Sequence, residues 1–191
     1  MARQKRGAQQ VRIIGGKWKG RKLRFSGDAG LRPTPGRMRE TLFNWLRAEI
    51  TDMRCLDAFA GSGALGFEAL SQGAARVVFV EQNPRTVRSL QDTVRELQAE
   101  EQASVVKGDL LRYLRQTGES FDLVFLDPPF ALSHISAEVL EVLQRRRLVR
   151  GYVYVESPDA AAVKQIAEQL GMAVEKETRA GDSSAVLLSP A

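Results

Sequence analysis

The sequence is poor in the side chains that many metal and nucleophilic sites require. Among 191 residues it has one cysteine, Cys55, and one histidine, His134. No intramolecular disulfide is possible and no zinc cluster can form, so we expect no metal. Cys55 falls inside a predicted strand, which favours a buried structural thiol over a nucleophile. No apolar run approaches a membrane span and no signal peptide precedes the first predicted strand, so a cytoplasmic protein without a membrane partner is expected.

Acidic residues are missing from the first 27 positions. That segment holds nine of the 28 basic residues, whereas the rest of the chain carries 19 basic and 23 acidic residues. The net charge of +5 therefore comes wholly from the N-terminal segment. A basic segment on an otherwise acidic domain indicates a polyanionic partner such as nucleic acid; a solvated tail is the alternative.

Three regions are predicted along the chain. Residues 1–10 are polar and basic and are expected to form a disordered tail. Residues 11–30 predict a β-hairpin extension, because Gly15 and Gly16 separate two short apolar stretches. Residues 31–191 are expected to form the main domain. Trp18 lies among the cations of the hairpin, and two roles are open for it: stacking on a base, or packing back onto the domain.

A helix is predicted within residues 31–49, with Thr34 as N-cap and Pro35 at the first helical position. Arg37 and Arg39 fall near its first turn, where the helix dipole disfavours cations by about 0.3–1 kcal/mol each. This placement indicates either an anionic partner or simple solvation. The candidate nucleic-acid contacts are Arg12, Lys17, Trp18, Lys19, Arg21, Lys22, Arg37 and Arg39.

Short apolar stretches alternate with amphipathic ones after residue 53. This alternation predicts an α/β, Rossmann-like fold with a mostly parallel sheet, and the hairpin signal near Gly181 adds an antiparallel strand. The predicted strands are 54–59, 76–81, 103–107, 121–127, 152–156, 172–178 and 183–188. The predicted helices lie at 64–73, 84–100, 135–147 and 159–170, with a short one after Asp109.

The stretch from Leu126 to Phe130 combines a buried strand end, an acid, two prolines and an aromatic ring. Because prolines cannot donate to a ladder, the strand must stop at Asp127, at the sheet edge where open α/β folds bind ligands. Asp127 and a carbonyl of the Pro128-Pro129 turn can accept hydrogen bonds from an exocyclic amine, and Phe130 can stack on a base. These four are the candidate catalytic residues; a plain strand followed by a stiff loop is the alternative.

A glycine-rich turn follows the first predicted sheet strand. Gly61, Gly63 and Gly66, with Glu81 further on, formally satisfy the dinucleotide fingerprint, so an NAD-dependent oxidoreductase is one hypothesis. Asp57 argues against it, because a carboxylate there would repel a pyrophosphate and attract the ammonium of S-adenosylmethionine. Glu81 could bind ribose hydroxyls and Asp109 an adenine amino group. The candidate cofactor contacts are Asp57, Phe59, Gly61, Ser62, Gly63, Glu81, Gln82, Asp109, Leu110 and Asp127.

Several stretches resemble known methyltransferases. The residues Asp127 to Phe130 match the [DNS]-P-P-[FYW] motif of amino-methyltransferases that use S-adenosylmethionine. Four further segments resemble members of the RsmD family. These proteins are bacterial small-subunit ribosomal RNA (guanine-N2)-methyltransferases. They are VRIIGGKWKGRKL at 11–23, LRPT at 31–34, RMRETLFNWL at 37–46 and LDAFAGSGALG at 56–66. The similarity extends over the chain from about residue 11, with a small departure at Pro35-Gly36.

This resemblance implies a seven-stranded methyltransferase sheet with its last strand antiparallel. It also implies methylation, with S-adenosylmethionine, of the exocyclic N2 of a guanine in 16S ribosomal RNA. The expected partner is that RNA within a 30S subunit or an assembly intermediate that contains ribosomal proteins. The enzyme itself is expected to be a monomer. Methylation of adenine N6 in RNA or DNA, and an RNA-binding module that has lost catalysis, are the remaining alternatives.

Overall fold

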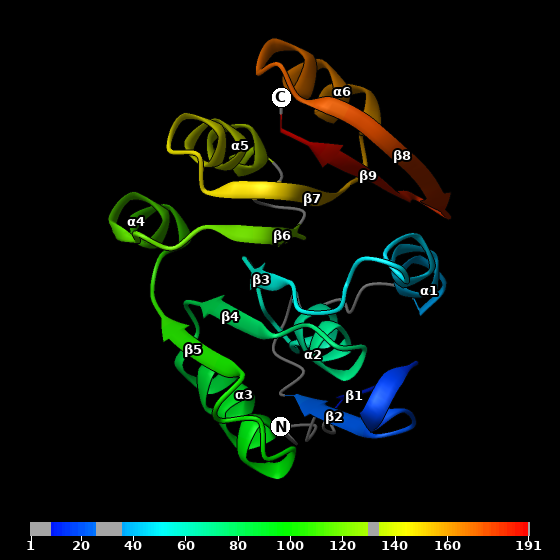
Figure 1. The fold of residues 1–191 in the computed structure, drawn as a ribbon, viewed down its shortest axis with the longest axis vertical. Helices are drawn as coiled ribbons and strands as arrows, with labels where there is room; N and C mark the ends of the chain where they lie inside the picture. The colour runs from blue at the N-terminus through cyan, green and yellow to red at the C-terminus, as the bar shows by residue number, and fades with distance from the viewer. Residues whose placement is uncertain (1–8, 26–35, 130–133, 191) are drawn as a thin grey trace, which may run out of the picture.

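The computed structural model describes residues 9–25, 36–129 and 134–190. Within them, a seven-stranded sheet has the order β5-β4-β3-β6-β7-β9-β8, and a separate two-stranded hairpin lies at one end of the molecule (Figure 1). Neighbouring sheet strands are parallel except at β9, which is antiparallel to both β7 and β8. The predicted fold class is therefore confirmed.

The elements follow the predicted order closely. The sheet strands are β3 (Arg54–Asp57), β4 (Arg76–Glu81), β5 (Ala103–Lys107), β6 (Phe121–Leu126), β7 (Val149–Ser157), β8 (Ala173–Ala180) and β9 (Ser183–Ser189). The helices are α1 (Gly36–Trp45), α2 (Ala64–Ser71), α3 (Pro84–Glu96), α4 (Leu110–Gln116), α5 (Ile135–Arg145) and α6 (Ala160–Gln169). The hairpin consists of β1 (Gln9–Arg12), the 3-10 turn η1 (Gly16–Trp18) and β2 (Lys22–Phe25).

The main differences from the predictions concern where elements begin and end. β7 begins three residues before the predicted strand at 152–156, because Val149 pairs with Phe121 across a register shift. β3 ends at Asp57 rather than Phe59, and α3 ends at Glu96 rather than near residue 100. The predicted cap residues Thr34 and Pro35 lie outside the described residues.

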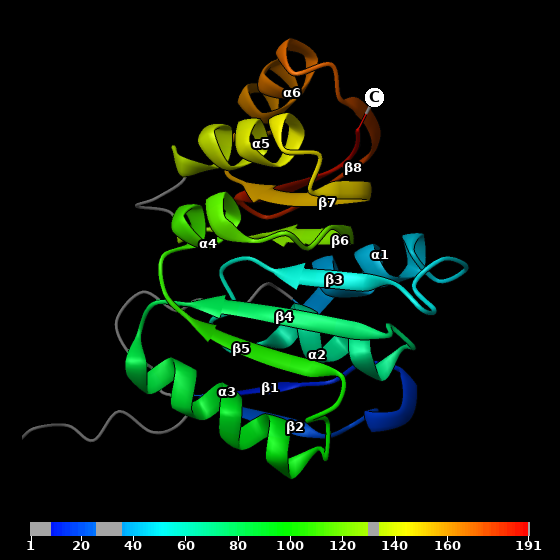
Figure 2. The same ribbon diagram turned by 60° about the vertical axis from the view of Figure 1, so that its left-hand side comes forward.

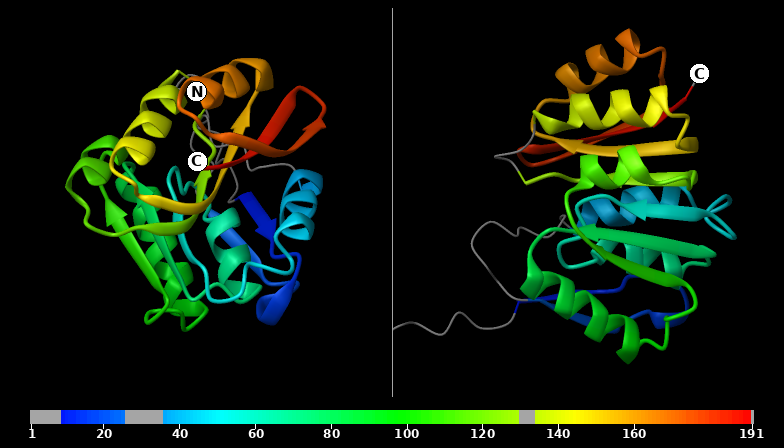
Figure 3. Two further views of the ribbon diagram at one scale, coloured as in Figure 1. Left: turned by 45° about the horizontal axis from the view of Figure 1, so that its top comes forward. Right: turned by 90° about the vertical axis from the view of Figure 1, so that its left-hand side faces the viewer.

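A separate hydrophobic core lies on each of the two faces of the sheet. The first core joins α1, α2 and α3 to one face, and its largest fully buried side chains are those of Tyr154, Phe67, Phe79 and Phe125. The second core joins α4, α5 and α6 to the other face, where these helices are stacked one above another (Figure 3, right). Because strands buried on both faces need apolar residues at nearly every position, β4 and β6 read as continuous apolar runs.

The hairpin is part of the first core. Its inward side chains, Val11, Ile13, Leu23 and Phe25, are all at most 8% exposed. β2 lies beside α3, and η1 lies against α2 (Figure 2). The close approach at η1 requires glycine: Gly16 has φ +73°, and a Cβ there would lie 1.7 Å from the carbonyl oxygen of Ser71. The hairpin thus packs as an integral part of the domain.

One buried carboxylate fixes the hairpin in place. Glu68 of α2 accepts hydrogen bonds from the backbone amides of Ile14 and Gly15, each at 2.8 Å. The guanidinium of Arg39 in α1 lies 3.7 Å from the same carboxylate and donates to the carbonyl of Arg12 at 3.1 Å. The side chains of Glu68 and Arg39 are 0% and 5% exposed. A charge buried this completely is tolerated because amides and an opposite charge surround it.

Replacement of Glu68 tests this attachment. Glu68→Ala leaves the two hairpin amides without their acceptor and the buried Arg39 guanidinium without its opposite charge, so we expect the free energy of unfolding to fall by about 3–5 kcal/mol. Denaturant unfolding measures the change. The matched control, Glu101→Ala at an exposed position, should change stability by no more than about 0.5 kcal/mol. Equal stabilities for the two variants would contradict the role given to Glu68.

Candidate active site

Three carboxylates meet at the carboxyl edge of the sheet. Asp57 ends β3 and lies in register with Phe79 of β4 and Phe125 of β6. Glu81 and Asp127 each stand two residues beyond those partners, and side chains two apart in a strand share one face. The sheet therefore brings Asp57, Glu81 and Asp127 to the same edge, where the charges of Glu81 and Asp127 act on Asp57.

Asp57 is the most deeply buried of the three, at 3% exposed. Its Oδ2 accepts a hydrogen bond from the backbone amide of Gly66 in the first turn of α2, at 3.0 Å. Burial raises the pKa of Asp57 to about 8, the Gly66 amide opposes this shift, and the charges of Asp127 and Glu81 add to it. These charges give the edge a negative potential, which favours a positively charged ligand.

The glycine turn is shaped by its own backbone and by Glu81. Gly63 has φ +73°, and a Cβ at this position would lie 2.5 Å from the ring of Phe67. Glu81 accepts from the amide of Gly61 with Oε2 at 3.0 Å and from the amide of Asn83 with Oε1 at 2.8 Å. Each carboxylate oxygen keeps a second acceptor position, so Glu81 can still bind a hydroxyl. Ser62 is partly exposed on this turn.

The predicted adenine end of the site forms around the start of α4. Asp109 caps this helix, with Oδ1 accepting from the amide of Arg112 at 2.8 Å. Its Oδ2 accepts from the side-chain amide of Gln82 at 3.0 Å, so these two candidates lie in contact. Phe59 is partly buried, whereas Leu110 is 2% exposed within the second core. The side chain of Leu110 therefore supports α4 from inside the protein.

The turn after β6 is described as far as Pro129. Asp127 is partly exposed, Pro128 is buried and Pro129 is exposed. Phe130 lies outside the described residues, so stacking of its ring on a base stays a prediction. β6 ends at Leu126, one residue before the predicted end at Asp127, and the two prolines prevent its continuation.

The candidate nucleic-acid residues separate into two groups. Arg12, Lys17, Lys19, Arg21, Lys22 and Arg37 are exposed. Trp18 is partly buried against the first core, with the Nζ of Lys17 4.4 Å from its ring centre, so it packs back onto the domain. Lys17 also donates to Gln102, just before β5, which places the η1 loop at the amino edge of the sheet, opposite Asp127.

Arg39 requires a correction. Its position near the start of α1 predicts an RNA contact, yet Arg39 is 4% exposed and its guanidinium contacts Glu68 and the Arg12 carbonyl. Burial lowers the pKa of Arg39, while the charges of Glu68, Glu40 and Glu156 oppose that shift. Arg39 thus neutralises buried acids inside the protein, and we leave it out of the RNA surface.

Glu156 is a residue at this edge that sequence reasoning missed. It lies near the carboxyl end of β7, is 8% exposed, and accepts a hydrogen bond from the hydroxyl of Tyr154 at 3.0 Å. The available signal was an acid that ends an apolar strand, which is the same signal that singled out Asp127.

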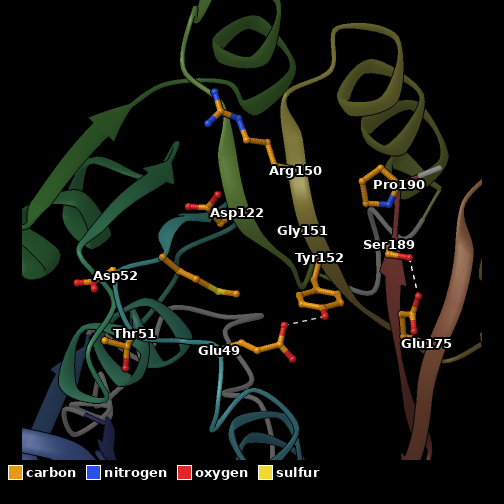
Figure 4. A pocket seen from close by; sticks show the side chains of 11 residues that line it. Glu49, Thr51, Asp52, Asp122, Arg150, Gly151, Tyr152, Glu175, Ser189 and Pro190 are labelled. Carbon is orange, nitrogen blue, oxygen red and sulfur yellow. Dashed lines mark hydrogen bonds between the residues drawn. The ribbon is translucent and has the colours of Figure 1, made fainter.

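A separate hollow lies at the amino edge of the sheet (Figure 4). It has a volume of about 530 Å³ and is lined by residues that include Glu49, Arg150 and Tyr152. The Tyr152 hydroxyl donates to Glu49 at 2.8 Å. None of the carboxylates at the carboxyl edge lines this hollow, so it is distinct from the candidate active site.

The burial of Asp57 predicts a pH-dependent stability. An unfolded chain loses the Asp57 proton near pH 4 and the folded protein near pH 8, so the native state loses stability as pH rises between these values. Asp57→Asn keeps an oxygen that can accept from the Gly66 amide, and its side chain cannot ionise at any of these pH values. The free energy of unfolding of this variant, measured relative to that of the parent, should therefore increase as pH rises, by at most about 1.4 kcal/mol per pH unit.

Denaturant unfolding at pH 5, 6, 7 and 8 measures this difference. Asp182→Asn, at an exposed turn position, is the matched control and should follow the parent at every pH. A constant stability difference between Asp57→Asn and the parent would show that Asp57 is ionised throughout this range.

Comparisons with known proteins agree with this geometry. A family model described as "Conserved hypothetical protein 95" matches residues 11–188. The ribosomal RNA small subunit methyltransferase D of Escherichia coli is 44% identical over 153 residues, which cover 79% of this chain and 76% of that protein. Its counterpart in Haemophilus influenzae is 42% identical over 153 residues, covering 78% and 79%.

Solved structures show the same arrangement. That of yhhF from Escherichia coli has a TM-score of 0.81 and 36% identity, covering 96% of this chain and 99% of that one. That of the hypothetical protein TTHA0928 from Thermus thermophilus has a TM-score of 0.75 and 33% identity, covering 94% and 99%. The chain therefore belongs to the family of ribosomal RNA small subunit methyltransferase D, the RsmD family that its motifs resemble.

Proposed function

We propose that this chain methylates the exocyclic N2 of a guanine in 16S ribosomal RNA, with S-adenosylmethionine as methyl donor. Membership of an rRNA methyltransferase family supports the class of reaction. The observation that carries the proposal is the meeting of Asp57, Glu81 and Asp127 at one sheet edge, beside a rigid Pro-Pro turn. This edge offers both a negatively charged cofactor site and an acceptor for an amine.

The residues fit S-adenosylmethionine better than a dinucleotide. The cofactor carries a sulfonium and an ammonium, and both are favoured by the negative potential around Asp57. A pyrophosphate would need the free amides at the start of α2, but Asp57 already occupies the Gly66 amide. Glu81 would hold the ribose hydroxyls and Asp109 the adenine amine. The bound cofactor would supply an activated methyl group.

The protein's own part in the reaction is to position the amine. Asp127 would accept a hydrogen bond from the exocyclic NH2 and direct its lone pair toward the methyl group. The Pro128-Pro129 turn adds a carbonyl acceptor on backbone that cannot relax easily. A guanine must leave its stack to reach this edge, as bases do for other enzymes that modify them.

The outer face of the hairpin fits the RNA backbone. Arg12 and Lys22 are exposed and directly opposite each other in the β1–β2 pair. Like charges in this position destabilise a hairpin, so bound phosphate would relieve their repulsion. We propose that these residues, with Lys17, Lys19, Arg21 and Arg37, contact ribosomal RNA within a 30S subunit or assembly intermediate. We expect the enzyme to act as a monomer. Because ribosomal subunits are its substrate, we expect it to act in the cytoplasm.

The function of Asp127 can be separated from cofactor binding. The parent should bind S-adenosylmethionine with a micromolar Kd, or about −8 kcal/mol, and Asp127→Ala should change this affinity far less than it changes turnover. Turnover should fall by orders of magnitude, because only the amine loses its acceptor. Asp127→Asn should keep some activity through its amide oxygen.

Calorimetry and transfer of labelled methyl groups measure the two quantities. Glu81→Ala serves as the opposite control, since it should weaken cofactor binding. Methylation by Asp127→Ala at the parental rate would remove this residue from the mechanism, and tighter binding of NAD than of S-adenosylmethionine would refute the methyltransferase proposal.

The hairpin surface predicts a salt dependence. Arg12→Gln combined with Lys22→Gln should reduce the slope of log affinity against log salt by about 1.4–1.8, since two phosphate contacts are lost. Cofactor affinity should stay at the parental value, and the melting temperature should not fall, because the two opposed like charges are removed. Arg47→Gln with Lys176→Gln removes the same charge from exposed positions on other elements and should leave the slope nearly unchanged. An identical slope for both double variants would exclude a docking role for the hairpin.

A further inference from the structure

The parallel pairing of β6 with β7 places a second acid beside Asp127. Phe125 is in register with Tyr154, and Leu126 with Val155. The next residue of β7 is Glu156, and the residue that directly follows the end of β6 is Asp127, so continuation of this register sets the two acids side by side. The charges of both acids act on the hydroxyl of Tyr154, which places the two carboxylates near the same side chain. Neighbouring strands are about 4.8 Å apart, so the two carboxylates can reach adjacent atoms of one small ring.

The surroundings of Glu156 hold its carboxylate in a fixed orientation. The Tyr154 hydroxyl donates to Oε1 at 3.0 Å. Burial and then the charge of Glu156 raise the pKa of Tyr154, so this hydroxyl stays protonated and keeps donating. The charge of Arg39, 4% exposed, acts on Glu156 as well as on Glu68. Arg39 Nε has no hydrogen-bond partner among the described residues. An acid restrained in this way is suited to recognition of a specific donor.

We infer that Glu156 accepts a hydrogen bond from the N1–H of the guanine whose N2 amine is held by Asp127. This inference rests on the proposed function. Guanine presents two neighbouring donors on this edge, N1–H and N2–H2, which two carboxylate acceptors can bind together. Adenine presents a donor beside an acceptor, and its N1 lone pair would face a carboxylate. Glu156 would thus select guanine, while Asp127 serves the reacting amine.

A solely structural role makes a different prediction. If Glu156 only balances the charge of Arg39, its replacement would lower stability and would affect every target base alike. A base analogue that changes the N1 position alone separates the two roles. 2-Aminopurine keeps the N2 amine but has an acceptor at N1 in place of the N1–H.

The experiment compares particles that carry guanine or 2-aminopurine at the methylated position. The parent should prefer guanine in kcat/KM at least tenfold, because 2-aminopurine cannot donate from N1 to the Glu156 carboxylate. Glu156→Gln can donate from its amide to the N1 of 2-aminopurine, so the preference should fall by at least tenfold. Glu101→Gln, at an exposed position, should keep the parental preference. Cofactor affinity should be equal in all three proteins.

The outcomes separate this inference from the proposed function. If the parent methylates no guanine N2, the proposed function itself fails. If it does so and Glu156→Gln retains the parental preference for guanine, the role of Glu156 is overturned. If Glu156→Gln does not fold, Glu156→Asp takes its place. The shorter acid should lower kcat/KM for guanine at least tenfold and leave that for 2-aminopurine nearly unchanged; equal losses for both bases would overturn the inference.

Discussion

The hydrogen bond from the Gly66 amide to Asp57 is the interaction on which the candidate site depends. It joins the end of β3 to the first turn of α2, and so fixes the glycine turn between them. A buried carboxylate this close to Asp127 and Glu81 is costly, as the raised pKa of Asp57 shows. Folding alone does not require such a cluster, whereas a cationic ligand would offset its repulsion. The proposed cofactor, which carries a sulfonium and an ammonium, is a ligand of this kind.

Helix α2 connects this site to the N-terminal hairpin. Its first turn donates to Asp57, and two residues after Gly66 the side chain of Glu68 accepts the hairpin amides. The hairpin therefore has two faces with different tasks. Its inner face completes the first core, and its outer face carries the opposed cations Arg12 and Lys22. Removal of the whole segment would disturb folding as well as the proposed RNA contact, so substitutions on the outer face are the cleaner probe.

Local pattern was sufficient to predict most of the fold. The strands at 76–81 and 103–107 were predicted at their observed residues, because apolar runs with clear ends depend on nearby positions alone. The acids at the ends of β3, β4 and β6 could be placed together because parallel strands share an edge. The burial of Arg39 could not be predicted, because its partner Glu68 lies in another helix and contacts it only through tertiary packing. The position of Glu156 beside Asp127 depends on the register between β6 and β7, and the sequence does not specify that register.

The central claim is that this sheet edge methylates the N2 amine of guanine in small-subunit ribosomal RNA. The most direct measurement is to incubate small-subunit particles that lack the modification with the protein and labelled S-adenosylmethionine, then digest the RNA and identify the labelled nucleoside by mass. The account predicts N2-methylguanosine as the labelled product, formed by the parent and lost with Asp127→Ala. Label in N6-methyladenosine, or in no nucleoside at all, would contradict it.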